Sequence, residues 1–204
     1  MRHRPGDLLR WWRSRDSQPW QRIEHFDPPP SPAQCVDDGL CITWINHATV
    51  LIQTAGLNIL TDPIFSQRAS PLSWAGPRRY HPPGVAFDAL PPIHVVAISH
   101  AHYDHLDRAS IRRLIARFDP LFVVPLGLEA CIHRFGGRRV VSRDWWQGLD
   151  LSARVRVTLT PARHWSRRGL FDRNRSLWAG FWFDAPAGPI YFAGDTGMGS
   201  HCQA

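Results

Sequence analysis

Four strong metal-binding side chains lie within six residues of one another, in the segment from residue 100 to residue 105. His100 and His102 are separated by one residue, and Asp104 and His105 are adjacent. Because residues i and i+2 of an extended loop point the same way, the two histidines of the first pair are predicted to hold one cation. The adjacent acid and histidine point differently, so they are predicted to serve a second cation. Imidazole suits zinc and similar borderline cations, and a carboxylate adds charge compensation.

The segments on either side place this cluster in a loop of an α/β fold. Residues 95–98 are apolar and partly β-branched, which predicts a buried strand. Asp107 is suited to cap a helix, and the apolar residues of the segment 111–118 follow with the spacing of one helix face. Loops at the carboxyl ends of strands are where α/β folds usually carry their sites. The alternative, three ordinary surface histidines beside an acid, is disfavoured because it gives this packing of ligands no structural use.

The chain from residue 40 onwards alternates between short apolar strands and loops. His164 comes just past one predicted strand, and Asp195 comes just past the last. The long loop over residues 62–92 is expected either to carry function or simply to cover the surface. The predicted strands are 41–45, 50–54, 57–60, 95–98, 121–124, 155–160, 177–183 and 190–192.

The His-x-His-x-Asp-His pattern after an apolar strand resembles the signature of the metallo-β-lactamase superfamily. Other sequence segments narrow the resemblance to the branch of phospholipases D that hydrolyse N-acyl-phosphatidylethanolamine. The resemblance runs from about Gly39 to Gly197. The segments that carry the resemblance are residues 44–52, 57–66, 76–80, 160–165 and 192–197.

The resemblance implies an α/β fold, the four-layer αβ/βα sandwich, with metals at one edge between its two sheets. Only nine residues follow Asp195, so the second half of the sandwich is expected to be incomplete and the chain truncated. Four aromatic residues are then expected to lack part of their cover, namely Trp178, Phe181, Trp182 and Phe183. The predicted organisation is a basic, Trp- and Pro-rich extension over residues 1–38 and a hydrolase domain over residues 39–204.

The resemblance also implies two zinc ions and a set of ligands for each. The first ion is expected on His100, His102 and His164, the second on Asp104 and His105, with Asp195 bridging both. The superfamily places a further histidine on the second metal, and no motif after Asp195 matches it; His201 is the sole histidine there. Two residues flanking the first hairpin, His47 and Asp62, are expected either to orient ligands or to form turns. Neither is predicted to be a direct ligand.

The implied activity is that of a metal-dependent hydrolase, specifically a zinc phosphodiesterase acting on phospholipids of the N-acyl-phosphatidylethanolamine type. Asp104, His105 and Asp195 are the predicted catalytic residues, and Asp104 is also expected to help orient the attacking water. A lactonase or another hydrolase of the same fold stays open, because ligand spacing alone cannot choose a substrate. A catalytically inactive fragment stays open as well.

Composition adds weaker indications about partners and location. The net charge is +7 and every basic residue is arginine, which suits a phosphate-bearing partner, although genomic base composition explains the missing lysines equally well. Nucleic acid is disfavoured as a partner. A short helix around Leu8 to Trp12 could lie on a membrane surface; the alternative is a tail that packs on the domain or stays disordered. The predicted location is cytoplasmic, with peripheral contact at the inner membrane as a second option. Four cysteines without paired spacing predict free thiols.

Overall fold

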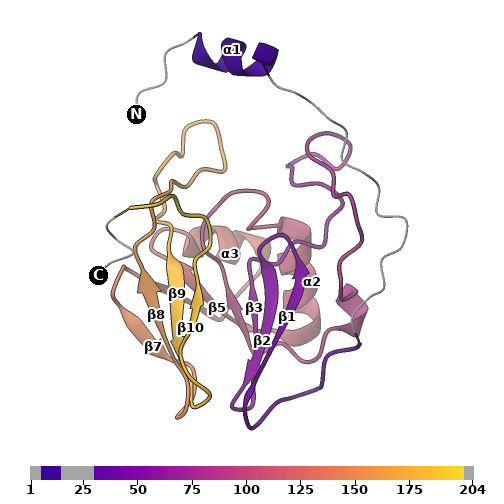
Figure 1. Cartoon of the computed structure of the whole chain (residues 1–204), viewed down its shortest axis with the longest axis vertical. Coiled ribbons are helices and arrows are strands. Elements are labelled where there is room, and N and C mark those ends of the chain that lie inside the picture. The colour runs from indigo at the N-terminus through magenta and orange to yellow at the C-terminus, as the bar shows by residue number, and fades with distance from the viewer. Residues whose placement is uncertain (1–5, 15–29, 200–204) are drawn as a thin grey trace.

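Two β-sheets lie face to face in the computed structural model, which describes residues 6–14 and 30–199 (Figure 1). The larger sheet has six strands in the order β1-β2-β3-β4-β5-β6. Their bounds are Leu40–Asn46 for β1, Thr49–Thr54 for β2, Leu57–Thr61 for β3, Val95–Ala97 for β4, Leu121–Pro125 for β5 and Val140–Arg143 for β6.

The larger sheet is mixed, and its parallel part sets the direction of the loops. Strands β1, β2 and β3 form an antiparallel meander, whereas β3, β4, β5 and β6 pair in parallel. Ile59 pairs with Val95, and Thr61 pairs with Ala97. Because parallel strands end at the same edge, the chain leaves β3 and β4 at neighbouring positions.

The smaller sheet is antiparallel and has four strands in the order β10-β9-β8-β7. Strands β8 and β10 both pair antiparallel with β9, so they run in the same direction and end at the same edge. The bounds are Gly148–Asp150 for β7, Arg156–Thr160 for β8, Gly180–Asp184 for β9 and Ile190–Phe192 for β10.

Two hydrophobic cores hold the layers together. One lies between the larger sheet and two helices, α2 over Arg108–Phe118 and α3 over Glu129–Phe135. The other lies between the two sheets, where Ile59 and Val95 of one sheet share a cluster with Phe181 of the other. Burial of these apolar faces holds the layers together, because it removes their surface from water.

The predicted α2 is confirmed. Asp107 caps the helix, and its side chain accepts hydrogen bonds from the backbone N–H groups of Ala109 and Ser110. Ile111 and Leu114 are fully buried on the predicted apolar face. The helix therefore anchors the C-terminal end of the histidine-rich loop to the core.

The expected loss of cover is wrong for two of the four aromatic residues. Phe181 and Phe183 are fully buried, because alternate residues of β9 face the larger sheet. Trp182 points the other way and is exposed, as is Tyr191 on β10. Trp178 donates its indole N–H to the Ala162 carbonyl. Among residues 30–199 no helix covers the outer face of the smaller sheet.

A short helix, α1, spans Asp7–Ser14, where the sequence left open a short helix or a tail. The side chains of Leu8, Leu9, Trp11 and Trp12 lie outside the described part of the structure, as do His201 and Cys202. No helix within the described ranges is long and apolar enough to cross a membrane. Cys35, Cys41 and Cys131 are free thiols, as predicted.

Candidate metal centre

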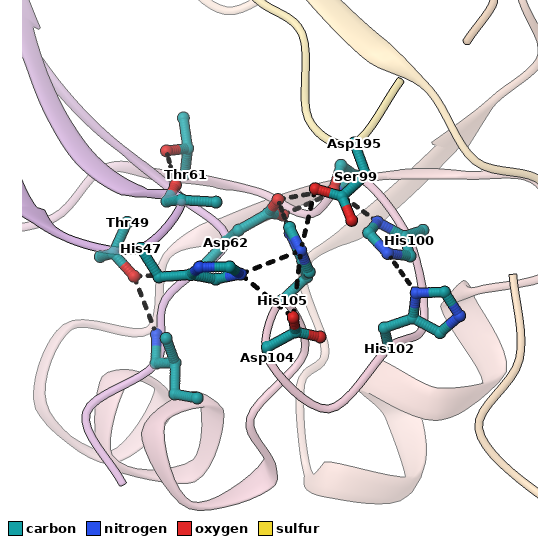
Figure 2. Close-up of polar contacts among 12 residues, drawn as sticks. His47, Thr49, Thr61, Asp62, Ser99, His100, His102, Asp104, His105 and Asp195 are labelled. Carbon is teal, nitrogen blue, oxygen red and sulfur yellow. Dashed lines mark hydrogen bonds and ion pairs between the residues drawn. The ribbon is translucent and has the colours of Figure 1, made fainter. Parts of the chain in front are cut away.

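Loops from both sheets converge at the edge where β3, β4, β8 and β10 end. Asp62 follows β3, the 99–105 loop follows β4, His164 follows β8 and Asp195 follows β10. The turn between β1 and β2 adds His47 at the same edge. Figure 2 shows His105 between His47 on one side and His100 and His102 on the other, with the Asp104 carboxylate beneath it. The structure thus brings together all six residues that the sequence proposed as ligands.

The first cluster contains His100, His102, His164 and Asp195. His100 Nε2 lies 2.7 Å from His102 Nδ1, and His164 Nε2 lies 3.3 Å from the same atom. His164 Nε2 also lies 3.5 Å from Asp195 Oδ2. His102 packs edge-on against Trp165, at 4.3 Å between ring centroids, which fixes the ring that presents Nδ1.

The second cluster contains Asp104, His105 and a residue not predicted as a ligand, His47. His47 Nε2 lies 3.1 Å from Asp104 Oδ2 and 3.3 Å from His105 Nε2. Asp104 Oδ2 lies 3.7 Å from His105 Nε2. Asp195 connects the clusters, because its Oδ1 lies 3.3 Å from His105 Nε2 while its Oδ2 faces His164.

These separations fit bound cations. Four donors about 2.0–2.1 Å from a tetrahedral zinc ion lie about 3.3–3.4 Å from one another. The close contacts within the first cluster measure 2.7, 3.3 and 3.5 Å, and those within the second measure 3.1, 3.3 and 3.7 Å. All ligand atoms of a cluster lie within 4.8 Å of one another. The donors are imidazole nitrogens and carboxylate oxygens, which suit zinc, iron, manganese and related ions. The residues present therefore fit a pair of transition-metal ions.

Hydrogen bonds behind the clusters orient two of the histidines. His105 Nδ1–H donates to Asp62 Oδ2 over 2.7 Å, which leaves Nε2 free for a cation. Ser99 Oγ donates to the same carboxylate and accepts from His100 Nδ1–H over 2.9 Å, which frees Nε2 of His100. Asp62 is completely buried and also accepts the Ser99 backbone N–H over 2.6 Å. Carboxylates that orient metal-binding histidines in this way raise the basicity of the ligand.

The shape of the histidine-rich loop differs from the predicted extended one. The loop turns after His102, whose carbonyl accepts the backbone N–H groups of His105 and Leu106 over 3.1 and 2.8 Å. This turn, and not strand-like alternation, aims Asp104 and His105 at a different position from His100. The first histidine uses Nε2 and the second Nδ1, which is how two such close residues reach one point.

Gly194 allows Asp195 to approach the histidine loop. Its φ of +58° lies in the left-handed region, and a Cβ there would meet Ser99 Cβ at 2.8 Å. The Ala179 N–H also donates to the Ser99 carbonyl over 3.0 Å, which ties the smaller sheet to the loop. A side chain at residue 194 would therefore push the bridging carboxylate away.

The charges in the two clusters differ. Burial lowers the pKa of His100 to about 2, and the neighbouring His105 adds to the effect. Burial also lowers the pKa of His102 and His164. Burial opposes a charge on His105 as well, but the carboxylates of Asp62 and Asp195 outweigh it and raise its pKa to about 10.

The two carboxylates of the clusters stay ionised. The hydrogen bond from His105 lowers the pKa of Asp195 to about 2, against an opposing effect of burial. Burial works against ionisation of Asp104, but the hydrogen bond with His47 and the charge of His105 lower its pKa well below the usual range. The site therefore offers negative charge and neutral imidazole side by side, as a divalent cation requires.

The sequence left two roles open for Asp62 and His47, orienting ligands or forming turns. The resemblance suggested that both residues orient ligands, and Asp62 does so through His105 and Ser99. His47 instead presents its Nε2 directly to Asp104 and His105. The sequence does contain the hairpin that carries His47. Only the pairing of the strands shows that the turn of this hairpin lies beside the histidine-rich loop.

Comparisons with known proteins agree with this site. Residues 57–203 match the model of the beta-lactamase superfamily domain. An uncharacterised protein of Mycobacterium tuberculosis is 42% identical over 78% of this chain and 42% of its own length. The N-acyl-phosphatidylethanolamine-hydrolyzing phospholipase D 1 of Caenorhabditis elegans is 37% identical over 79% of this chain and 48% of its own length.

The fold comparison points the same way. The metallo hydrolase Igni18 of Ignicoccus hospitalis superposes with a TM-score of 0.62 at 19% identity, covering 80% of this chain and 64% of its own. The chain spans less than half the length of these two curated relatives. The family match covers most of the chain and contains every predicted metal ligand. The chain therefore belongs to the metallo-β-lactamase superfamily and carries the domain of a metal-dependent hydrolase.

Proposed function

We propose that this protein is a two-metal phosphodiesterase and that its substrate is a phospholipid of the N-acyl-phosphatidylethanolamine type. The observation that carries the proposal is the pairing of two ligand clusters through Asp195, directly beside a pocket lined by arginine. Two bound cations would acidify a water molecule and balance charge on the attacked phosphate and the leaving oxygen. The relative from Caenorhabditis elegans, named for hydrolysis of this phospholipid, supports the choice of substrate.

The residues of the site have separate tasks in this proposal. Asp195 directs one carboxylate oxygen toward each cluster, so it holds the two positions at a fixed spacing. Asp104 directs Oδ2 toward His47 and His105, and its partly exposed carboxylate can accept a hydrogen bond from the attacking water. His105, held by Asp62, keeps the second position aligned with Asp195.

A pocket of about 230 Å³ adjoins the second cluster and is suited to a phosphate group. Its lining includes His47 and Asp104 together with Arg78 and Arg79. The guanidinium of Arg79 is held by the carbonyls of Ile64 and Ser66, so its charge is fixed at the pocket wall. Arginine pairs with phosphate oxygens through parallel hydrogen bonds, and this favours a phosphodiester over an uncharged ester.

Two loops beyond the metal edge are suited to a lipid surface. The loops after β3 and after β8 both extend past the ends of the strands, on the same side of the molecule (Figure 1). Each carries large apolar side chains in water, and each carries arginine. Apolar side chains that enter a bilayer, with basic residues beside them, bind anionic membranes. The exposed apolar residues are Leu72, Trp74, Leu170 and Phe171.

The test is a comparison of three substrates with protein purified without chelator. The substrates are N-acyl-phosphatidylethanolamine in vesicles, a lactone and a short RNA. We expect release of N-acylethanolamine from the vesicles, little effect on the other two, and loss of release in Asp195→Ala. Hydrolysis of the lactone alone, or of none of the three by metal-loaded protein, would overturn the proposal.

The variant Arg78→Ala tests the pocket without changing the metal ligands. This variant should raise KM for the phospholipid and leave the number of bound cations unchanged, since Arg78 lies outside both clusters. A variant with unchanged KM would count against the pocket as the phosphate site.

A further inference from the structure

His47 reaches the second cluster from a distant part of the sequence. It stands in the turn between β1 and β2, 57 residues before Asp104. Its Nε2 lies within 3.3 Å of both Asp104 Oδ2 and His105 Nε2, although half of its side chain is open to solvent. The ring meets His105 edge-on, with 4.9 Å between centroids, so it presents a nitrogen and not a ring face.

The separations match a coordination sphere better than they match a simple ion pair. An ion pair needs one short contact between His47 and Asp104. The structure instead groups three donors, from His47, Asp104 and His105, and adds Asp195 Oδ1 at 3.3 Å from His105 Nε2. His47 Nε2 lies 3.1 Å from Asp104 Oδ2 and 3.3 Å from His105 Nε2, and His105 Nε2 lies 3.3 Å from Asp195 Oδ1 and 3.7 Å from Asp104 Oδ2. A tetrahedral zinc ion predicts about 3.3–3.4 Å for each.

The backbone at His47 is held in an uncommon conformation. Its φ is +42°, in the left-handed region that favours glycine or asparagine in such turns. Hydrogen bonds keep it there: the Trp44 indole donates to the His47 carbonyl over 3.0 Å, and Thr61 Oγ1 donates to the Ala48 carbonyl over 2.8 Å. Residues held in such conformations concentrate at functional sites, where the surrounding contacts must hold them in place.

We infer that His47 is a direct ligand of the second cation through Nε2. The second cluster then has four protein donors: Asp104 Oδ2, His105 Nε2, Asp195 Oδ1 and His47 Nε2. The superfamily pattern supplies a further histidine from later in the chain, whereas His47 comes from the first hairpin. The inference rests on the two-metal part of the proposed function and is independent of the substrate.

The first experiment measures bound metal in three forms of the chain. Wild type, His47→Ala and the control His81→Ala are loaded with Zn²⁺, dialysed and analysed for zinc. His81 stands in the loop after β3, where its ring packs near Trp44 and outside both clusters. We expect two ions in wild type and in the control and one in His47→Ala, with affinity at the second position reduced by more than about 100-fold. Two tightly held ions in His47→Ala would overturn the inference.

The second experiment separates a ligand from a hydrogen-bond partner. His47→Gln can still donate to Asp104 but is a poor ligand for zinc, whereas His47→Cys supplies a thiolate ligand. Loaded with Co²⁺, His47→Cys should bind two ions and add a sulfur-to-metal charge-transfer band, and His47→Gln should bind one. A glutamine variant with the wild-type spectrum and two ions would show that His47 only pairs with Asp104.

The metal readings separate this inference from the proposed substrate. A chain that binds two cations through His47 and does not cleave the phospholipid keeps the inference and refutes the proposed function. A chain that cleaves the phospholipid and still holds two ions tightly in His47→Ala does the reverse.

Discussion

The two ligand clusters share Asp195 but are built in different ways. The first draws His100, His102 and His164 from strand ends of both sheets, and His100 is almost completely buried. The second draws on a surface hairpin, and the His47 and Asp104 side chains are 49% and 40% exposed. Desolvation keeps the first set of imidazoles neutral, whereas the carboxylates around His105 favour its charged form. The first cluster is therefore ready for a cation, and the second must give up a proton to accept one.

The largest effect is expected at Asp195, the residue that both clusters share. Asp195→Ala removes a donor from both clusters at once. The affinity for each ion should therefore fall by more than about 100-fold, and activity should be lost. Zinc analysis after dialysis measures this. Asp88→Ala, at an exposed aspartate that pairs with Arg113 outside both clusters, is the control. Retention of two tightly held ions by Asp195→Ala would contradict the shared arrangement.

Asp62→Asn should affect the second cluster more than the first. The carboxylate accepts His105 Nδ1–H directly and reaches His100 only through Ser99. Loss of its charge should weaken the second ion by about 10–100-fold and the first by less. The metal-free protein should also lose about 1–3 kcal/mol, since the pair is fully buried. Stepwise zinc titration and thermal melting test both parts, and equal weakening of the two ions would argue against the path through His105.

Metal binding should depend on pH at the second cluster alone. The pKa of His105 is raised to about 10, so at neutral pH a cation must displace its proton, and affinity should rise about tenfold per pH unit between about pH 6 and pH 8. His100 is neutral over that range because its pKa is lowered to about 2, so the first ion should bind with nearly constant affinity. Calorimetry in two buffers with different heats of ionisation counts the protons released. Release of no proton with the second ion would be inconsistent with a charged His105.

Ser99→Ala gives the smallest expected effect. The hydroxyl links His100 to Asp62, and its removal leaves the His100 ring held by burial and packing. We expect the first ion to weaken by about tenfold or less, at the lower end for groups that orient metal ligands. Ser110→Ala, at another buried serine, controls for general loss of stability. A loss as large as that in Asp62→Asn would mean that this hydroxyl, and not burial, orients the first cluster.

Local sequence was enough for the elements that depend on neighbours in the chain. Asp107 with the apolar spacing of residues 111–118 gave α2, and the strands that carry His164 and Asp195 were found from their composition. The ligands from residue 100 to residue 105 were found because one loop holds them all. Family and fold were predicted from this loop and the other motifs that resemble the superfamily, and the matched domain confirms both.

Tertiary structure decided what depends on contacts between distant segments. Only the pairing of β3 with β4 sets Asp62 behind His105, and only the β1–β2 turn sets His47 against Asp104. The alternation of β9 against the larger sheet decided that Phe181 is buried while Trp182 is exposed. Spacing in a sequence reports which residues share a loop, whereas coordination needs particular atoms within a few ångströms. Those positions follow from strand register and burial, which no short stretch of the chain contains.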